Sequence, residues 1–289
     1  MRRVQAVREL LGHIDRMVII GGLRWSLDEP NYLALAINST FRRQRQALGA
    51  SVTLAETGQG DLAVGFVRPA LDERLWLAYL CSLDRELANK ILLAMGRYDA
   101  IRSLQCQRDY IGDEAMLGLW YPSGFVDANA SQLDGVKAEL KNVGNDLGWG
   151  NRPLPGADWL AKQVGATAEY DYLHSATSRV LHFSAGEIMR RGWGTPGEVL
   201  ITDKPEFREH LTEFALDQLW RLWLATLRVT LDHLEDAGLT SDPTFDLEPE
   251  EVVGDLSGMG RVPLVHAHEW NLTPEGQLPL PRPPLGDES

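Results

Sequence analysis

The amino-acid sequence predicts an all-α protein, a multi-helix bundle followed by an irregular, proline-rich and acidic C-terminal tail. Apolar residues recur at three- and four-residue steps through several long segments, the spacing that places them on one helix face. The composition, 44% hydrophobic and 24% charged, is typical of a globular chain with a sizeable core. We therefore expect a helical domain at 1–238, with N-terminal helices (4–49) and a core bundle (68–238) giving about seven to nine helices in all. Eight of the fifteen prolines follow, in an extended tail at 239–289.

Two N-terminal helices are expected at residues 4–25 and 31–49. The segment Asp28–Pro30 separates them, and proline is tolerated at a helix start because the first amides of a helix have no intrahelical partner. The glycine-containing segment 57–61 predicts a loop after the second helix.

The most regular helical pattern covers residues 68–95. Its apolar residues keep helical spacing throughout, and Pro69 would lie in the first turn, where proline is tolerated. Arg68 and Asp72 are one turn apart and should form an ion pair. Glu73 projects from a different side of the helix, so we expect it to meet another helix.

Further helices are expected at 97–120, with a break near Gly112, at 130–147, and at 157–190 in one or two pieces. Turn residues follow two of these helices. They are YPSG at 121–124, after the helix at 97–120, and GWGTPG at 192–197, after the helical region at 157–190. Each of these segments therefore predicts the end of a helix.

The last strong pattern runs from 206 to 238, more than thirty residues with a wide apolar stripe. Trp220 and Trp223 lie on it, where aromatic side chains usually fill a core. Gly238 suits the position just after a helix end. A helix this long and apolar should be central, packed against several others or against a second protomer, and we expect a homodimer or a protein partner. In the tail, residues 262–266 give a weak strand signal.

The net charge of −13 is unevenly distributed. The tail holds ten acidic residues against two arginines, whereas residues 1–50 hold eight arginines against four acidic residues. The cluster Arg42, Arg43 and Arg45 in this basic region could meet the phosphates of RNA, although such a run is more often a solvated helix face.

The apolar run at residues 17–23 is too short for a signal peptide or a membrane span, so the chain is expected to be cytoplasmic, without membrane contact. Cys81 and Cys106 lie in apolar helical patterns without CxxC spacing, which argues against a zinc site. The string HAHE at 266–269 is weak evidence for a metal. No metal site and no cofactor is therefore predicted.

The segment 169–186 is the most suggestive for chemistry. On a helix, His174, Ser178 and His182 share one face, with Arg179 three residues before the second histidine. A histidine beside arginine and serine could move a proton and stabilise an anion. The alternative is that the histidines are packed in the core. Glu73 facing this helix would make a structural or catalytic pair.

These residues resemble the bacterial helical family catalogued as domain of unknown function 5677, over roughly residues 30–235. The resemblance is carried by two short motifs, Arg68, Pro69 and Glu73 on one helix and Tyr170, Leu173, Ser178 and His182 on another. More distantly, the chain is similar to the HEPN superfamily, many of whose members are metal-independent ribonucleases of toxin and phage-defence systems. That similarity implies that His182 would assist attack of a ribose 2′-hydroxyl on phosphate and that Arg179 would stabilise the charge that develops.

Three functions follow as hypotheses. The first is a noncatalytic protein-interaction module in a bacterial stress or phage-defence context, favoured by the acidic tail and by the absence of familiar catalytic motifs. The second is a HEPN-like ribonuclease that uses Arg179 and His182. The third is a metal- or ligand-binding helical enzyme built from Glu73, His174 and His182. The candidate binding residues are Arg68, Tyr170, His174 and the arginine cluster at 42–45.

Overall fold

The computed structural model describes residues 2–20, 23, 26, 29–119, 123–181, 192–195, 198–201, 205–240, 246 and 249–264. Its α-helices are α1 Arg2–Ile20, α2 Tyr32–Glu56, α3 Val64–Cys81, α4 Arg85–Ile111, α5 Asp113–Gly118, α6 Ser123–Ala130, α7 Leu133–Leu147, α8 Ala157–Gln163, α9 Thr167–Leu181, α11 Pro205–Thr230 and α12 Glu250–Gly258. Two 3-10 turns, η1 Gly60–Ala63 and η2 Leu231–His233, and two strands, β1 Gly192–Thr195 and β2 Glu198–Ile201, complete the described elements.

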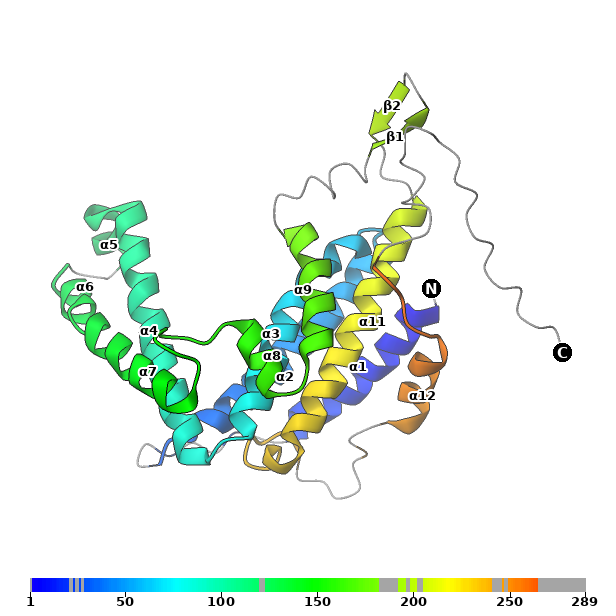
Figure 1. Cartoon of the computed structure of the whole chain (residues 1–289). Helices are drawn as coiled ribbons and strands as arrows, with labels where there is room; N and C mark the ends of the chain where they lie inside the picture. The colour runs from blue at the N-terminus through cyan, green and yellow to red at the C-terminus, as the bar shows by residue number, and fades with distance from the viewer. Residues whose placement is uncertain are drawn as a thin grey trace.

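The prediction of an all-α fold is confirmed, since the described elements are helices and 3-10 turns except for one small hairpin. In this hairpin β1 pairs antiparallel with β2, with Gly192 opposite Ile201 and Thr195 opposite Glu198. The segment that the sequence predicts as a turn thus begins as a strand. The hairpin stands away from the helical body (Figure 1).

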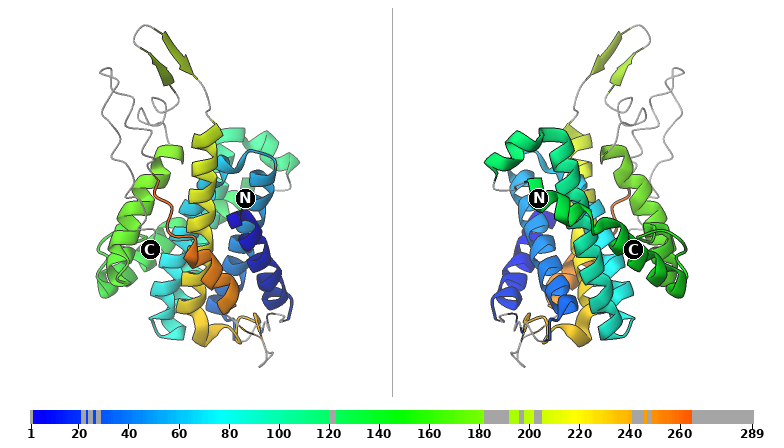
Figure 2. Two further views of the ribbon diagram at one scale, coloured as in Figure 1. Left: turned by 90° about the vertical axis from the view of Figure 1, so that its right-hand side faces the viewer. Right: turned by 90° about the vertical axis from the view of Figure 1, so that its left-hand side faces the viewer.

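Helix α11 is the central element of the body (Figures 1 and 2). It packs most extensively against α3 and also against η1, α2 and α1. Residues 214–220 are buried on every side, and Trp220 and Trp223 are 2% and 0% exposed, so their prediction as core residues is confirmed. The rings of Trp223 and Phe41 of α2 meet edge to face at 6.1 Å. The helix ends at Thr230 rather than near 238, and Gly238 takes a positive φ of 65° in the turn that follows.

The regular pattern at 68–95 forms two helices instead of one. Helix α3 ends at Cys81, and α4 begins at Arg85 with Asp84 as its N-cap, whose carboxylate accepts the Glu86 amide at 2.8 Å. The predicted position of Pro69 is also wrong, because α3 begins at Val64 and places this proline inside the helix.

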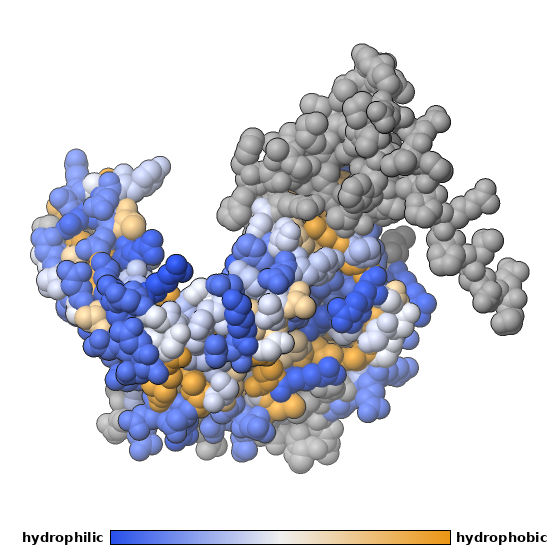
Figure 3. Space-filling view, in the orientation of Figure 1, coloured by the Kyte–Doolittle hydropathy of each residue, from blue (hydrophilic) through white to orange (hydrophobic). Residues whose placement is uncertain are grey.

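The outer part of α4 and the helices α5, α6 and α7 form an arm that extends from the body (Figure 1). The arm has its own small core, separate from the main one, made of Ala94, Tyr98, Ile101, Leu133, Val136 and Leu140. The predicted break near Gly112 is confirmed, since this residue has a φ of 83° and separates α4 from α5. Figure 3 shows an open hollow between the arm and the body.

A row of aromatic rings joins the base of the arm to the body. Trp149, just after α7, meets Trp159 of α8 edge to face at 5.8 Å, and Trp159 meets Tyr79 of α3 at 5.3 Å. Gly148 ends α7 in the left-handed conformation, which lets Trp149 fold back over the last turn. The arm is therefore fixed at its base by ring contacts.

The expectation of an extended, poorly packed chain after residue 239 is wrong for residues 250–264. Residues 250–258 form α12, which packs against α1 (Figure 2). Leu256 and Leu264 are 0% and 4% exposed and belong to the main core. Residues 261–264 form no strand, and 265–289 lie outside the described residues.

Within the described part of the chain, no helix combines the length and the apolar character that crossing a membrane requires.

Candidate functional site

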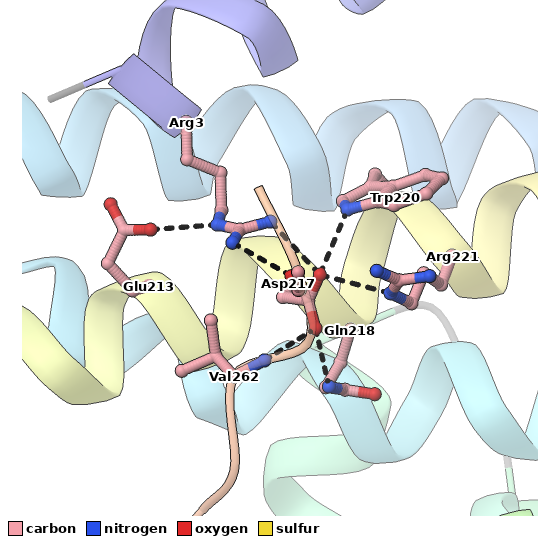
Figure 4. Close-up of polar contacts among 8 residues, drawn as sticks. Arg3, Glu213, Asp217, Gln218, Trp220, Arg221 and Val262 are labelled. Atoms are coloured by element: carbon pink, nitrogen blue, oxygen red, sulfur yellow. Dashed lines mark hydrogen bonds and ion pairs between the residues drawn. The ribbon is translucent and has the colours of Figure 1, made fainter. Parts of the chain in front are cut away.

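Asp217 of α11, which has no exposed surface, is the centre of a buried polar cluster (Figure 4). Its Oδ1 atom accepts hydrogen bonds from Arg3 Nη1 and Arg221 Nε, both at 3.0 Å, and from Trp220 Nε1 at 3.3 Å. Its Oδ2 atom accepts the Val262 amide at 3.1 Å and Gln218 Nε2 at 3.2 Å. The cluster therefore joins α1, α11 and the segment after α12.

Arg3 is buried with Asp217, although the sequence counts it in the basic N-terminal region. It is 3% exposed, and its Nε also donates to Glu213 at 2.7 Å. Its Nη2 donates to the Gly260 carbonyl at 3.2 Å. A buried guanidinium needs such acceptors because an unpaired buried charge is costly. This arginine therefore serves the fold and contributes nothing to a basic surface.

The segment after α12 is bound to the body through its backbone. Besides the Val262 amide, the Leu264 amide donates to the Tyr172 hydroxyl of α9 at 2.8 Å. The Pro263 carbonyl lies 2.7 Å from Nε2 of His210 on α11. These contacts hold residues 260–264 in an irregular conformation between α9 and α11.

The predicted constellation on α3 and α9 is partly assembled. The predicted Arg68–Asp72 pair is confirmed, with Nε at 3.0 and 3.1 Å from the two carboxylate oxygens. The Arg68 guanidinium also lies over the Tyr170 ring at 5.7 Å, and that ring lies 5.0 Å from His174. The two motifs from which the resemblance was inferred are thus neighbours in space, and the helical prediction for 169–181 is confirmed.

Glu73 meets another helix, as predicted, but that helix is α2. Its Oε1 atom lies 2.9 Å from Nε of Arg43, and the carboxylate is 15% exposed. Burial raises the pKa of Glu73, while Arg43 and a hydrogen bond with Gln44 oppose the increase. Among the described contacts, Glu73 therefore joins α3 to α2.

The other arginines of the predicted basic cluster also have partners inside the chain. Arg42 Nε donates to Asn38 at 2.7 Å, and Arg45 donates to both oxygens of Asp15 at 2.6 and 3.0 Å. The latter pair holds the pKa of Asp15 below its usual range. Binding of RNA phosphate by this cluster stays a prediction.

The remaining predicted site residues lie only partly within the described residues. The backbone of Arg179 is in α9, and Ser178 is half-buried on the same helix. His182 and the string at 266–269 lie outside the described residues. Within the described parts of the chain, no group of three or more His, Cys, Asp or Glu side chains could hold a metal.

The two cysteines differ in environment. Cys81 is half-buried, and burial raises the pKa of its thiol to about 11, which keeps it protonated near neutral pH. Cys106 is exposed on α4, contrary to the expectation that it would pack as a small hydrophobe.

A cavity of about 640 Å³ lies between α3, α9, α11 and α12. Four arginines line it, Arg74, Arg221, Arg228 and Arg261, together with one acidic residue among its described lining, Glu169. Sequence reasoning missed this site because its arginines come from three distant segments. The one local signal is the seven-residue spacing of Arg221 and Arg228, which places both on one face of α11.

The tip of the arm carries an unusual concentration of exposed apolar side chains. Five of the ten large apolar residues that are exposed in the described chain lie between positions 110 and 125. They are Tyr110 at 91%, Leu117 at 57%, Leu119 at 52%, Phe125 at 49% and Ile111 at 37% exposed. The elements that carry them, the end of α4 with α5 and α6, contact one another.

Comparison with protein-family models, with curated proteins and with solved structures gave no match. The resemblance to domain of unknown function 5677 and to the HEPN superfamily therefore stays a prediction, as do the ribonuclease and metal-enzyme hypotheses.

Proposed function

We propose that the protein is a noncatalytic interaction module that binds a protein partner through the tip of its arm, in a bacterial stress or phage-defence context. The concentration of exposed apolar side chains at this tip carries the proposal. Apolar side chains that stay in water cost free energy, and a binding partner that covers them would remove that cost.

The charges around the patch indicate the chemistry of the partner. Asp109, Asp113, Glu114 and Asp127 are exposed there, whereas Arg108 is the one basic residue of the described segments 105–119 and 123–127. Arg108 lies 2.6 Å from Asp127 and 3.9 Å from Asp113, which leaves an acidic excess. The partner should therefore present an apolar face with a basic rim.

Site-specific photo-cross-linking in cells tests this proposal. A photoreactive residue at position 117 should give a discrete protein adduct, and the double substitution Tyr110→Ser with Phe125→Ser should abolish it. A photoreactive residue at position 62 is the matched control, because Leu62 is also 57% exposed but lies on η1 of the body. Equal adducts from positions 62 and 117, or none from 117, would contradict the proposal.

A homodimer is the second outcome that the experiment must separate. An adduct of twice the chain mass, matched by a dimer in sedimentation that the tip substitutions dissociate, would show that the tip binds a second copy. An adduct with a different protein from a monomeric chain is the result that we expect.

A further inference from the structure

We infer that the arginine-lined cavity between α3, α9, α11 and α12 binds a small organic phosphate of about nucleotide size. This inference concerns a different face of the molecule from the arm tip and does not depend on the proposed function.

The charge of the cavity is opposite to that of the chain. The protein has a net charge of −13, yet four arginines and one carboxylate line this space. Bringing like charges together is unfavourable unless an anion lies between them, and low-dielectric walls strengthen both effects. Glu169 and Asp217 each offset one of these charges, through Arg74 and Arg221, and the guanidinium groups that still face the cavity are complementary to an anionic ligand.

Arg74 supplies the buried end of the site. Its side chain is 15% exposed, and its Nη1 atom lies 2.9 Å from the Glu169 carboxylate. Its Nε and Nη1 atoms are fully buried without a well-formed hydrogen bond, so the contact with Glu169 is an ion pair of poor geometry. A guanidinium in this state retains donors for an acceptor from a ligand.

Arg221 and Arg261 supply further positive charge. The Arg221 guanidinium is held by Asp217 at 3.0 Å and lies 4.4 Å from the centre of the Trp220 ring, so its position is fixed before a ligand arrives. Arg261 is exposed in the segment that the Asp217 cluster and Tyr172 hold against the body. Planar guanidinium groups match phosphate oxygens in pairs, which favours phosphate over a simple halide.

The size and the remaining walls of the cavity favour an organic ligand. A volume of about 640 Å³ is far larger than a phosphate ion needs and falls in the usual range for small-molecule sites. Leu173, Leu224 and Val253 are among its lining residues and provide apolar surface. The apolar part of the ligand would pack there while its phosphates face the arginines.

Calorimetric titration of the full chain with ADP and with inorganic pyrophosphate, at about 50 mM salt to limit screening, tests the inference. ADP should bind one site per chain, and pyrophosphate should bind the same site more weakly. Arg261→Gln, at an exposed position where folding is not at risk, and Arg74→Lys, which keeps the charge but loses the planar group, should each weaken ADP binding about tenfold or more. Arg97→Gln on the arm is the matched control and should bind like the wild type.

Three outcomes would overturn the inference. The first is the absence of saturable binding of either probe at millimolar concentration. The second is ADP affinity that is the same in Arg74→Lys, Arg261→Gln and wild type. The third is tighter binding of a 12-nucleotide single-stranded RNA than of ADP, lost in the same two variants, which would assign the cavity to nucleic acid.

Discussion

At the scale of single residues, Asp217 shows how one buried carboxylate can join distant segments. Five hydrogen-bond donors surround it, and two of them are arginines. Arg3 is more than two hundred residues away in the sequence, whereas Arg221 is one helical turn away. Such a group is costly to bury, and its hydrogen bonds and ion pairs offset that cost. Removing its charge alone should therefore be more damaging than removing an exposed carboxylate.

We predict that Asp217→Asn lowers the free energy of unfolding by about 3–5 kcal/mol, because it leaves Arg3 without its buried counter-charge. The control Asp134→Asn removes a carboxylate that is 97% exposed and should change stability by less than about 1 kcal/mol. Urea denaturation followed by circular dichroism measures both. Equal effects of the two substitutions would show that the Asp217 charge has no special role.

Glu73 gives a pH prediction at the same scale. Burial raises its pKa above the ordinary value of 4.5, so the folded state binds this proton more tightly than the unfolded state does. Its contribution to stability is complete below 4.5 and is lost as the pH rises through the higher folded pKa. Glu73→Gln should therefore gain stability relative to wild type as the pH rises from about 4 to 7.

Denaturation midpoints of wild type and Glu73→Gln at both pH values check this expectation. If the ion pair with Arg43 outweighed burial, the Gln variant would instead lose stability toward neutral pH.

At the scale of elements, local periodicity predicted where helices exist but not where they end. The break at 82–84 was missed because apolar spacing continues through it, while the Asp84 cap that starts α4 is a short-range signal. Helix α12 was missed because proline and acidic residues dominate its surroundings, although Val252, Val253 and Leu256 keep helical spacing.

The end of α7 offers an element-scale prediction, because Trp149 folds against Gly144. A Cβ added at Gly144 would lie 2.6 Å from Trp149 Cδ1 and 2.7 Å from the Gly150 carbonyl oxygen. Gly144→Ala should thus cost about 1–3 kcal/mol through overpacking. Gly135→Ala, on the same helix with no atom within 4 Å of the added carbon, should instead stabilise by about 0.5–1 kcal/mol. Urea midpoints of the two variants should move in opposite directions, and a shift in the same direction would contradict the packing argument.

At the scale of the whole molecule, the candidate site was the least predictable part. The Arg68–Asp72 pair follows from one-turn spacing along α3. Helix geometry also predicts that Glu73 projects from a different side of α3 than Arg68 and Asp72. Which helix Glu73 meets depends on packing between elements, as does the cavity, whose arginines at 74, 221 and 261 converge only in the folded chain. Spacing along a sequence carries no information about such convergence.

The division into a main core and a separate arm core leads to a prediction about cooperativity. A small cluster buries little apolar surface, so the arm should open at a lower free energy than the body around α11. Amide hydrogen exchange should accordingly be faster in α7 than in the buried stretch 214–220 of α11.

Two leucine substitutions separate the two units. Leu140→Ala, in the arm core at 0% exposed, should cost about 2–5 kcal/mol locally and should speed exchange in α7 while leaving α11 unchanged. Leu219→Ala, in the main core at 2% exposed, should speed exchange in α11 with little effect on α7, because the arm already exchanges through its own opening. If each substitution accelerated both helices equally, the arm and the body would unfold as one cooperative unit, and the aromatic row Trp149–Trp159–Tyr79 would have to couple them fully.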